Sequence, residues 1–187
     1  MAMFERRLRD GERFELEVER YLVRHPDILA VGRSGTEHTL PEFMPLLRRD
    51  RSESAKFIRF APDGVAAPRG DPAFHWEAKH SRYIERAAWE TYVRHEQAGC
   101  RVLLFLRSSL GVFHAWASQL PFVDSHEFVQ QYPKERRFPV VEGWIHPRRN
   151  ESEGRLLTGS GTPFRVIDYS RCPLLMSLDE WALATAD

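Results

Sequence analysis

Two carboxylates and a lysine, Asp63, Glu77 and Lys79, are close enough in the sequence to belong to one catalytic site. Asp63 precedes a glycine, and Glu77 and Lys79 are two residues apart at the end of the segment Ala73–Lys79. Carboxylates that converge beside an ammonium group suit a hard cation such as Mg²⁺, which prefers oxygen ligands. A metal held in this way polarises a phosphoryl oxygen and activates water, so the chemistry that fits is hydrolysis of a phosphodiester. Lys79 would orient that water or stabilise the developing charge.

The segment Ala73–Lys79 has the composition of a β-strand, on which side chains point to opposite faces in turn. Trp76 is expected to face a core, whereas Glu77 and Lys79 share the other face, about 7 Å apart along the strand. His75 and His80 flank the motif on opposite faces and are therefore a poor metal pair. Both are interpreted as surface residues, with His75 the better candidate to support the site.

The residues before this strand complete the expected arrangement. Lys56–Val65 is predicted as a second strand, and Pro68–Pro72, which is dense in turn residues, as the hairpin connection. Asp63 would then lie at the end of the second strand, where the hairpin brings it beside Glu77. The bland alternatives are a turn aspartate before a glycine and an exposed Glu–Lys ion pair of little energetic value.

Helices and strands on either side of the hairpin are expected to support this site. Residues 11–24 carry apolar side chains at helical spacing, and residues 82–97 form a second helical segment. Residues 101–107 are an almost continuous apolar run, typical of a central strand covered on both faces. Strand, helix and strand in succession predict a parallel pair with a right-handed crossover. The other expected elements are a connection over 33–54 with a short helix, strands over 110–117, 138–145 and 164–169, and a last helix opened by a capping box at 177–180.

Pro62-Asp63 followed by Glu77-Ala78-Lys79 resembles the signature of the PD-(D/E)xK nuclease superfamily, which includes Holliday-junction-resolvase-like and restriction-endonuclease-like enzymes. The resemblance covers roughly residues 11–117. It implies an α/β fold with a restriction-endonuclease-like core: the element order α-β-β-β-α-β, a mixed central sheet flanked by helices, and a C-terminal elaboration. The connection over residues 33–54 is longer than is usual in compact resolvases.

Many members of this superfamily also place a metal-binding glutamate in the first helix, in a Gly-x-x-Phe-Glu context that Gly11–Glu15 matches. A helical wheel puts Glu15 about 100° from the apolar Phe14, at the border of the buried face. Glu19, one turn on, is the alternative. The resemblance implies Glu15, Asp63 and Glu77 as ligands of Mg²⁺, for which Mn²⁺ would substitute, and Lys79 as the remaining catalytic residue.

Composition and charge set the outer limits on function. The chain has 27 basic and 27 acidic residues, and this balance argues against a broad, non-specific nucleic-acid coat. Only three of the basic residues are lysines; arginine suits bidentate phosphate contacts, although GC-rich coding or a warm habitat produces the same bias. Two cysteines are too few for a disulfide framework or a four-ligand zinc site, which favours the cytoplasm. No signal peptide and no apolar run long enough to span a membrane is expected.

These patterns predict one domain in two parts, a nuclease core over residues 1–120 and an elaboration over residues 121–187 packed on it. The expected function is that of a Mg²⁺-dependent deoxyribonuclease, an endonuclease of resolvase-like type. The expected partner is branched or duplex DNA, and two copies of the chain are candidates to pair as a homodimer. The alternative is a catalytically silent protein of the same fold that binds nucleic acid or a protein partner.

Overall fold

The computed structural model describes residues 2–35, 41–50, 52–131, 138–147 and 162–186. Its elements, in chain order, are α1 (Ala2–Arg24), β1 (Ile28–Arg33), η1 (Pro41–Phe43), α3 (Met44–Arg49), α4 (Glu53–Arg59), β2 (Gly64–Pro68), β3 (Phe74–Lys79), β4 (Tyr83–Glu85), α5 (Arg86–Gln97), β5 (Val102–Ser108), β6 (Gly111–Trp116), η2 (Ala117–Gln119), α6 (Ser125–Gln131), β7 (Val140–Val141), β8 (Trp144–Ile145), β9 (Phe164–Val166), η3 (Tyr169–Arg171), β10 (Leu174–Met176) and α7 (Leu178–Thr185).

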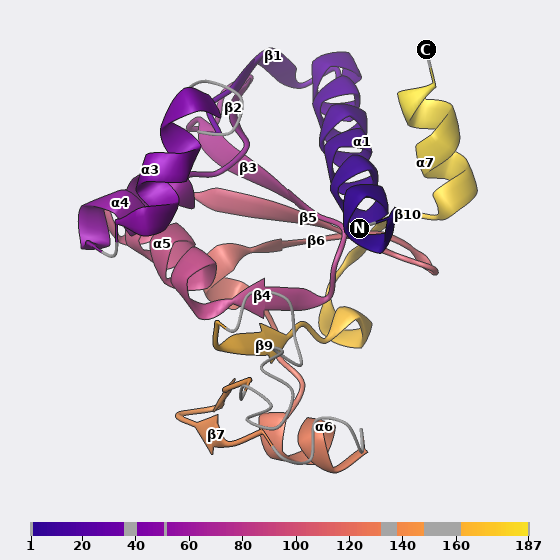
Figure 1. The fold of residues 1–187 in the computed structure, drawn as a ribbon. Coiled ribbons are helices and arrows are strands. Elements are labelled where there is room, and N and C mark those ends of the chain that lie inside the picture. The colour runs from indigo at the N-terminus through magenta and orange to yellow at the C-terminus, as the bar shows by residue number, and fades with distance from the viewer. Residues whose placement is uncertain (1, 36–40, 51, 132–137, 148–161, 187) are drawn as a thin grey trace.

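A six-stranded sheet in the order β1-β2-β3-β5-β6-β10 forms the centre of the molecule, with helices on both of its faces (Figure 1). Strands β3 and β5 are parallel, and every other neighbouring pair in this sheet is antiparallel. The predicted parallel pair is therefore confirmed, with α5 as its crossover. The order α1, β1, β2, β3, α5, β5 is the expected α-β-β-β-α-β, so the predicted α/β fold class is confirmed.

Each face of the sheet has its own apolar core. On one face, Phe14 and Val18 of α1 pack with the fully buried Trp76 of β3 and with Trp181 of α7. On the other face, apolar side chains of α5 pack against Val102, Leu104 and Leu106 of β5. Because β5 also sends Phe105 into the first core, it is covered on both sides, as its continuous apolar run predicted.

The strand predicted over residues 56–65 is wrong. Residues 53–59 form helix α4, in which Ser52 Oγ accepts a hydrogen bond from the Ala55 N–H at 3.1 Å and Glu53 pairs with Lys56 at 2.7 Å. An N-cap and an ion pair three residues apart both favour a helix over a strand. Strand β2 begins only at Gly64, so Asp63 lies at its start rather than near its end.

Other differences concern short elements. Strand β1 was not predicted; it is an edge strand that pairs with β2 and has a register irregularity. The segment expected as a helix from residue 82 opens with the short strand β4, and α5 begins at Arg86. The strand expected over 138–145 is a hairpin whose turn residues Glu142 and Gly143 have positive φ angles of 51° and 75°. The capping box at Ser177 is confirmed.

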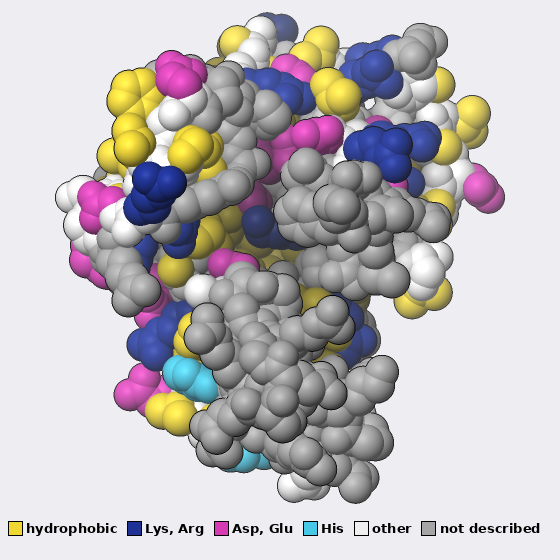
Figure 2. Space-filling view, in the orientation of Figure 1, with side chains coloured by type: hydrophobic (Ala, Val, Ile, Leu, Met, Phe, Trp, Pro, Cys, Tyr) yellow, Lys and Arg dark blue, Asp and Glu magenta, His cyan; other side chains and the backbone are white. Residues whose placement is uncertain are grey.

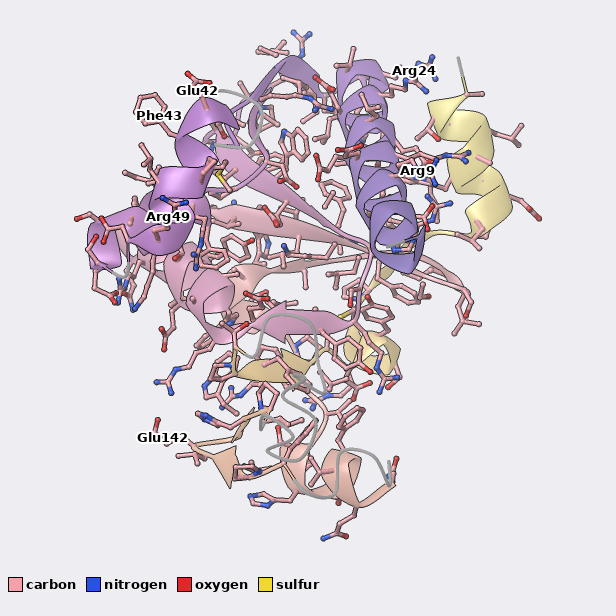
Figure 3. All side chains as sticks on the ribbon, viewed as in Figure 1. Arg9, Arg24, Glu42, Phe43, Arg49 and Glu142 are labelled. Carbon is pink, nitrogen blue, oxygen red and sulfur yellow. The ribbon has the colours of Figure 1, made fainter. Side chains whose placement is uncertain are left out.

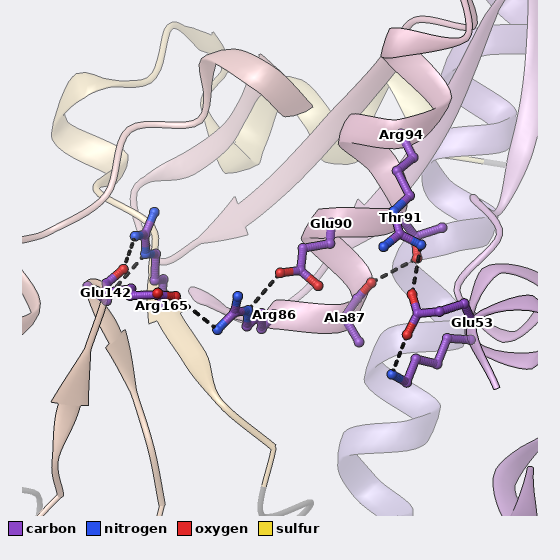
Figure 4. A network of polar contacts seen from close by, with 10 residues as sticks. Glu53, Arg86, Ala87, Glu90, Thr91, Arg94, Glu142 and Arg165 are labelled. Atoms are coloured by element: carbon purple, nitrogen blue, oxygen red, sulfur yellow. Dashed lines mark hydrogen bonds and ion pairs between the residues drawn. The ribbon is translucent and has the colours of Figure 1, made fainter. Parts of the chain in front are cut away.

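A second sheet, in the order β4-β9-β8-β7, joins later residues to the core through the antiparallel pairing of β4 with β9. Arg86 pairs with Glu90 of its own helix at 2.6 Å and with Glu142 at 3.5 Å, which links α5 to the β7–β8 turn (Figure 4). Strand β10 and helix α7 return to the central sheet and to α1. The division of the chain near residue 120 remains a prediction. Among the described residues, no helix is both long and apolar enough to cross a membrane.

Candidate active site

The β2–β3 hairpin places Asp63 beside Glu77. Gly64 of β2 is paired with Trp76 of β3, so the residue before Gly64 lies opposite the residue after Trp76. The Asp63 N–H donates a hydrogen bond to Glu77 Oε2 at 3.2 Å, and the Ala78 N–H donates one to Asp63 Oδ2 at 2.8 Å. Each carboxylate is therefore held by the backbone of the opposite strand, which fixes their relative position.

Glycine at position 64 permits this close approach. A Cβ atom there would overlap the indole ring of Trp76 and the backbone carbonyl of Gly32. The ring cannot move aside, because Trp76 is fully buried in the core beneath α1. The absence of a side chain therefore keeps the start of β2, and with it Asp63, close to β3.

Glu77 is the most buried charged group of the site, with 4% of its surface exposed. Its Oε1 forms an ion pair with Lys79 Nζ and accepts a hydrogen bond from the Tyr92 hydroxyl at 2.7 Å. Lys79 Nζ also lies 5.7 Å from the centre of the Tyr92 ring. Strand alternation is confirmed, since Glu77 and Lys79 share the face toward α5 while Trp76 lies in the opposite core.

Electrostatics couple the members of this cluster. Burial, and then the charges of Glu77 and Glu15, raise the pKa of Asp63 well above its usual range, and Lys79 opposes this only in part. Burial works against the Lys79 ammonium, but Glu77, Tyr92 and Asp63 outweigh it and hold the pKa of Lys79 well above its ordinary value. The Asp63 carboxylate is thus repelled by two other carboxylates, and the Lys79 ammonium offsets this repulsion only in part.

The structure separates the two candidate glutamates of α1. Glu15 lies close enough to Asp63 for its charge to raise the Asp63 pKa. Glu19 pairs with Arg33 of β1 at 2.9 Å. Glu15 is therefore the α1 glutamate whose charge acts on Asp63, while the carboxylate of Glu19 is paired with Arg33 beside the sheet edge.

The donor set matches the chemistry of Mg²⁺, because three carboxylates from α1 and the β2–β3 hairpin supply hard oxygen ligands and an excess of negative charge. Among the described residues, no three His, Cys, Asp or Glu side chains are already arranged to hold a metal. Asp63 and Glu77 form the closer pair, and Glu15 lies near Asp63 on a separate element. A bound ion would relieve the repulsion that raises the Asp63 pKa.

Tyr92 belongs to this site and could not be recognised from the sequence. It is 2% exposed, and a buried aromatic residue on the inner face of a helix is ordinarily a core residue. Burial, followed by the charge of Glu77, raises the pKa of Tyr92 well above its usual value, so its hydroxyl keeps its proton and donates. Of the two flanking histidines, His80 is exposed as predicted, whereas His75 is partly buried against His95 of α5.

The central mixed sheet has helices on both faces, an aspartate directly before β2 and a Glu-x-Lys pair at the end of the adjacent β3. Among solved structures, the chain is similar to Archaeoglobus fulgidus Hjc, a Holliday junction resolvase from an archaeal hyperthermophile. That similarity has 17% sequence identity and a TM-score of 0.40, and covers 61% of this chain and 78% of that one. No protein-family model and no curated protein sequence matches the chain significantly. The chemical role of the site is therefore inferred from its side chains.

Proposed function

We propose that this protein is a divalent-metal-dependent nuclease that hydrolyses phosphodiester bonds of DNA, as an endonuclease of resolvase-like type. One observation supports this above the others: Asp63, Glu77 and Lys79 converge across the β2–β3 hairpin, with Glu15 of α1 near Asp63. An isolated surface ion pair would not bury Glu77 or raise the Asp63 pKa.

In this proposal Glu15, Asp63 and Glu77 hold Mg²⁺, and Mn²⁺ substitutes for it. The bound ion supplies Lewis-acid stabilisation of phosphoryl charge and lowers the pKa of a water nucleophile. Lys79 keeps its proton because its pKa is raised, so it acts as a cation and hydrogen-bond donor toward the attacking water or the phosphate and not as a general base. Tyr92 fixes the orientation of Glu77 through its hydrogen bond.

The test is cleavage of branched, duplex and single-stranded DNA by the purified protein in Mg²⁺ or Mn²⁺. Asp63→Ala and Lys79→Ala are expected to lower the rate at least about a hundredfold, the usual cost of losing a group that stabilises transition-state charge. Lys56→Ala is the matched control, because Lys56 lies on α4 and pairs with Glu53 of the same helix. This variant should cleave like the wild type. Equal rates in wild type and both site variants, or no cleavage of any substrate, would overturn the proposal.

Two features favour a second candidate, a catalytically silent protein that binds nucleic acid or a protein partner. Glu77 Oε1 is already engaged by Lys79 and Tyr92, and no three-ligand set is preassembled among the described residues. Calorimetric titration with Mn²⁺ separates the two readings. Heat of binding that disappears in Asp63→Ala supports the nuclease, and a folded protein that binds no Mn²⁺ supports the silent binding protein.

A homodimer is part of the same proposal. Hydrophobic side chains are exposed over η1, α3 and α4 (Figure 2), where Phe43, Leu46 and Ile58 are 48%, 59% and 44% exposed. Exposed apolar patches of this kind are a common feature of surfaces that bind another protein. Light scattering of the samples prepared for the cleavage assay would give the oligomeric state.

A further inference from the structure

His75 of β3 and His95 of α5 form an imidazole pair that phosphodiester hydrolysis does not use. Their ring centres lie 5.1 Å apart and their planes are inclined at 53°. His75 Nδ1 and His95 Nε2 are both buried and have no hydrogen-bond partner among the residues that the structure describes. A buried polar atom without a partner is costly, so a ligand bound by these two nitrogens would remove that cost from both rings.

The ring separation fits a single metal ion bound by both imidazoles. Zinc–nitrogen bonds are about 2.0–2.1 Å long, and an imidazole centre lies roughly 1.1 Å behind its nitrogen, so two rings on a tetrahedral ion have centres about 5 Å apart. Imidazole nitrogen suits Zn²⁺ and the neighbouring transition metals, whereas Mg²⁺ prefers oxygen. The donor type therefore distinguishes this pair from the carboxylate cluster.

The surroundings of His95 hold its ring in place. Phe57 of α4 stacks on His95 with ring centres 4.5 Å apart and planes at 21°, which limits rotation of that ring.

We propose that His75 and His95 form a binding site for a borderline divalent transition metal, with Zn²⁺ as the ion best suited to it, separate from the carboxylate site. No third His, Cys, Asp or Glu side chain completes this set among the described residues, so water occupies the remaining positions. Since His75 belongs to β3 and His95 to α5, the ion ties the helix that carries Tyr92 to the strand that carries Glu77. This proposal does not depend on nuclease activity.

Calorimetric titration of the intact chain with Zn²⁺, in excess Mg²⁺, tests the site. The wild type should bind one equivalent, and His95→Gln should weaken binding at least about tenfold, since even loss of a supporting group costs about 10- to 100-fold. His126→Gln, which alters an exposed histidine of α6, is the control and should bind like the wild type. Zn²⁺ should also raise the melting temperature of the wild type but not of His95→Gln.

Three outcomes would overturn the proposal: no Zn²⁺ binding by the wild type, unchanged binding by His95→Gln, or loss of binding in Asp63→Asn, which would place the ion on the carboxylates. His75→Gln provides a second variant, and melting curves in EDTA report whether each variant is folded. Retained Zn²⁺ binding in a cleavage-deficient Asp63→Asn protein would support the histidine site whether or not the proposed nuclease function stands.

Discussion

Glu77 is the residue on which the polar contacts of the site converge. Its Oε2 accepts the Asp63 N–H, while its Oε1 faces both the Lys79 ammonium and the Tyr92 hydroxyl. A buried carboxylate with both oxygens engaged is held in one orientation before any substrate arrives, and this kind of support is what a precise catalytic group needs. Tyr92 and Asp63 are therefore the residues at which single substitutions are most informative.

Tyr92→Phe removes one hydroxyl and keeps the ring that lies near Lys79. A hydrogen bond to a charged group is worth about 1.5 kcal/mol or more. If this energy is lost from the stabilisation of the transition state, cleavage should slow roughly tenfold or more. Tyr83→Phe is the control, because Tyr83 is 45% exposed on β4. Initial rates across a range of pH check the prediction, and a Tyr92→Phe rate equal to that of the control would show that Tyr92 only fills the core.

Asp63→Asn removes a charge and keeps an acceptor for the Ala78 N–H. Burial and then the charges of Glu77 and Glu15 raise the pKa of Asp63. The ionised Asp63 carboxylate therefore lowers the stability of the folded protein when no metal is bound. In EDTA at pH 7 the variant should melt a few degrees above the wild type, since 1 kcal/mol corresponds to about 2–4 °C for a chain of this size.

This stabilisation depends on pH in a definite direction. The wild type should gain stability as pH falls through the raised pKa of Asp63, and below about pH 4 the carboxyl is protonated in both folded and unfolded states. The melting difference between Asp63→Asn and wild type should therefore vanish there. Asp71→Asn, in the exposed hairpin turn, is the control. A difference that stays constant from pH 4 to pH 7 would contradict the electrostatic explanation.

At the scale of elements, helix α1 presents different chemistry on its two flanks. One flank carries Glu15 and Glu19 toward the start of β2. The other flank is rich in arginine and faces α7; Figure 3 shows Arg9 and Arg24 projecting from α1 on that side. Arg24 donates to the carbonyls of Ala184 and Ala186 at the end of α7. A groove of about 500 Å³ lies between the two helices.

Glu17 holds this layer together, and its loss should be costly. It is 7% exposed and accepts contacts from three elements, namely from Arg13 of α1 at 3.1 Å, Arg107 of β5 at 2.6 Å and Trp181 of α7 at 2.9 Å. Glu17→Ala leaves the Trp181 N–H and the Arg107 guanidinium without this partner, which should lower the free energy of unfolding by about 3 kcal/mol. Denaturant titration checks the value, with the exposed Glu12→Ala as control; equal losses in both would mean that Glu17 is not a structural anchor.

At the scale of the whole molecule, the small sheet is attached to the core through β4, which leads directly into α5, and through Arg165 of β9. The Arg165 guanidinium lies 4.5 Å from the centre of the Trp144 ring. It is also 5.9 Å from the ring centre of Trp89 on α5 and 5.1 Å from that of Phe122. It donates to the carbonyls of Glu142 and Gly143 at 2.8 and 3.0 Å (Figure 4). The small sheet has its own apolar cluster, but that cluster is modest in size, so its attachment to α5 matters.

Arg165→Lys keeps the charge and loses the planar contacts with three rings and two carbonyls, because lysine cannot stack or donate in a fork. We expect amide hydrogens of β7, β8 and β9 to exchange faster, while those of β3 and β5 keep their protection. Arg101→Lys is the control, because Arg101 is exposed and its guanidinium lies 3.7 Å from the centre of the Trp116 ring, outside the small sheet. Unchanged exchange in the small sheet would show that Arg165 does not attach it to the core.

The pattern of neighbouring residues was sufficient to predict the features that depend on a single helix or strand. The alternation of strand Phe74–Lys79, the helical spacing of α1, the apolar run of β5 and the Ser177 capping box each depend on neighbours within a few residues. The pairing of Asp63 with Glu77 followed from the hairpin turn between them. Asp63, Glu77 and Lys79 could therefore be named from the residues alone, whereas Glu15 was implied by the resemblance of Gly11–Glu15 to the nuclease motif. The catalytic roles of all four remain proposals.

Only the tertiary structure decided what depends on contacts between distant segments. Strands β1, β4 and β10 are too short or irregular to predict, because their hydrogen bonds come from neighbours elsewhere in the chain. The sequence placed a carboxylate pair and a lysine on one hairpin, but it could not show that α5 supplies the Tyr92 hydroxyl to Glu77. Nor could it choose between Glu15 and Glu19, since that choice depends on how α1 is rotated over the sheet. The relative position of Asp63, Glu77 and Lys79 follows from the local sequence of one hairpin, whereas the groups around them are determined by how distant helices pack on it.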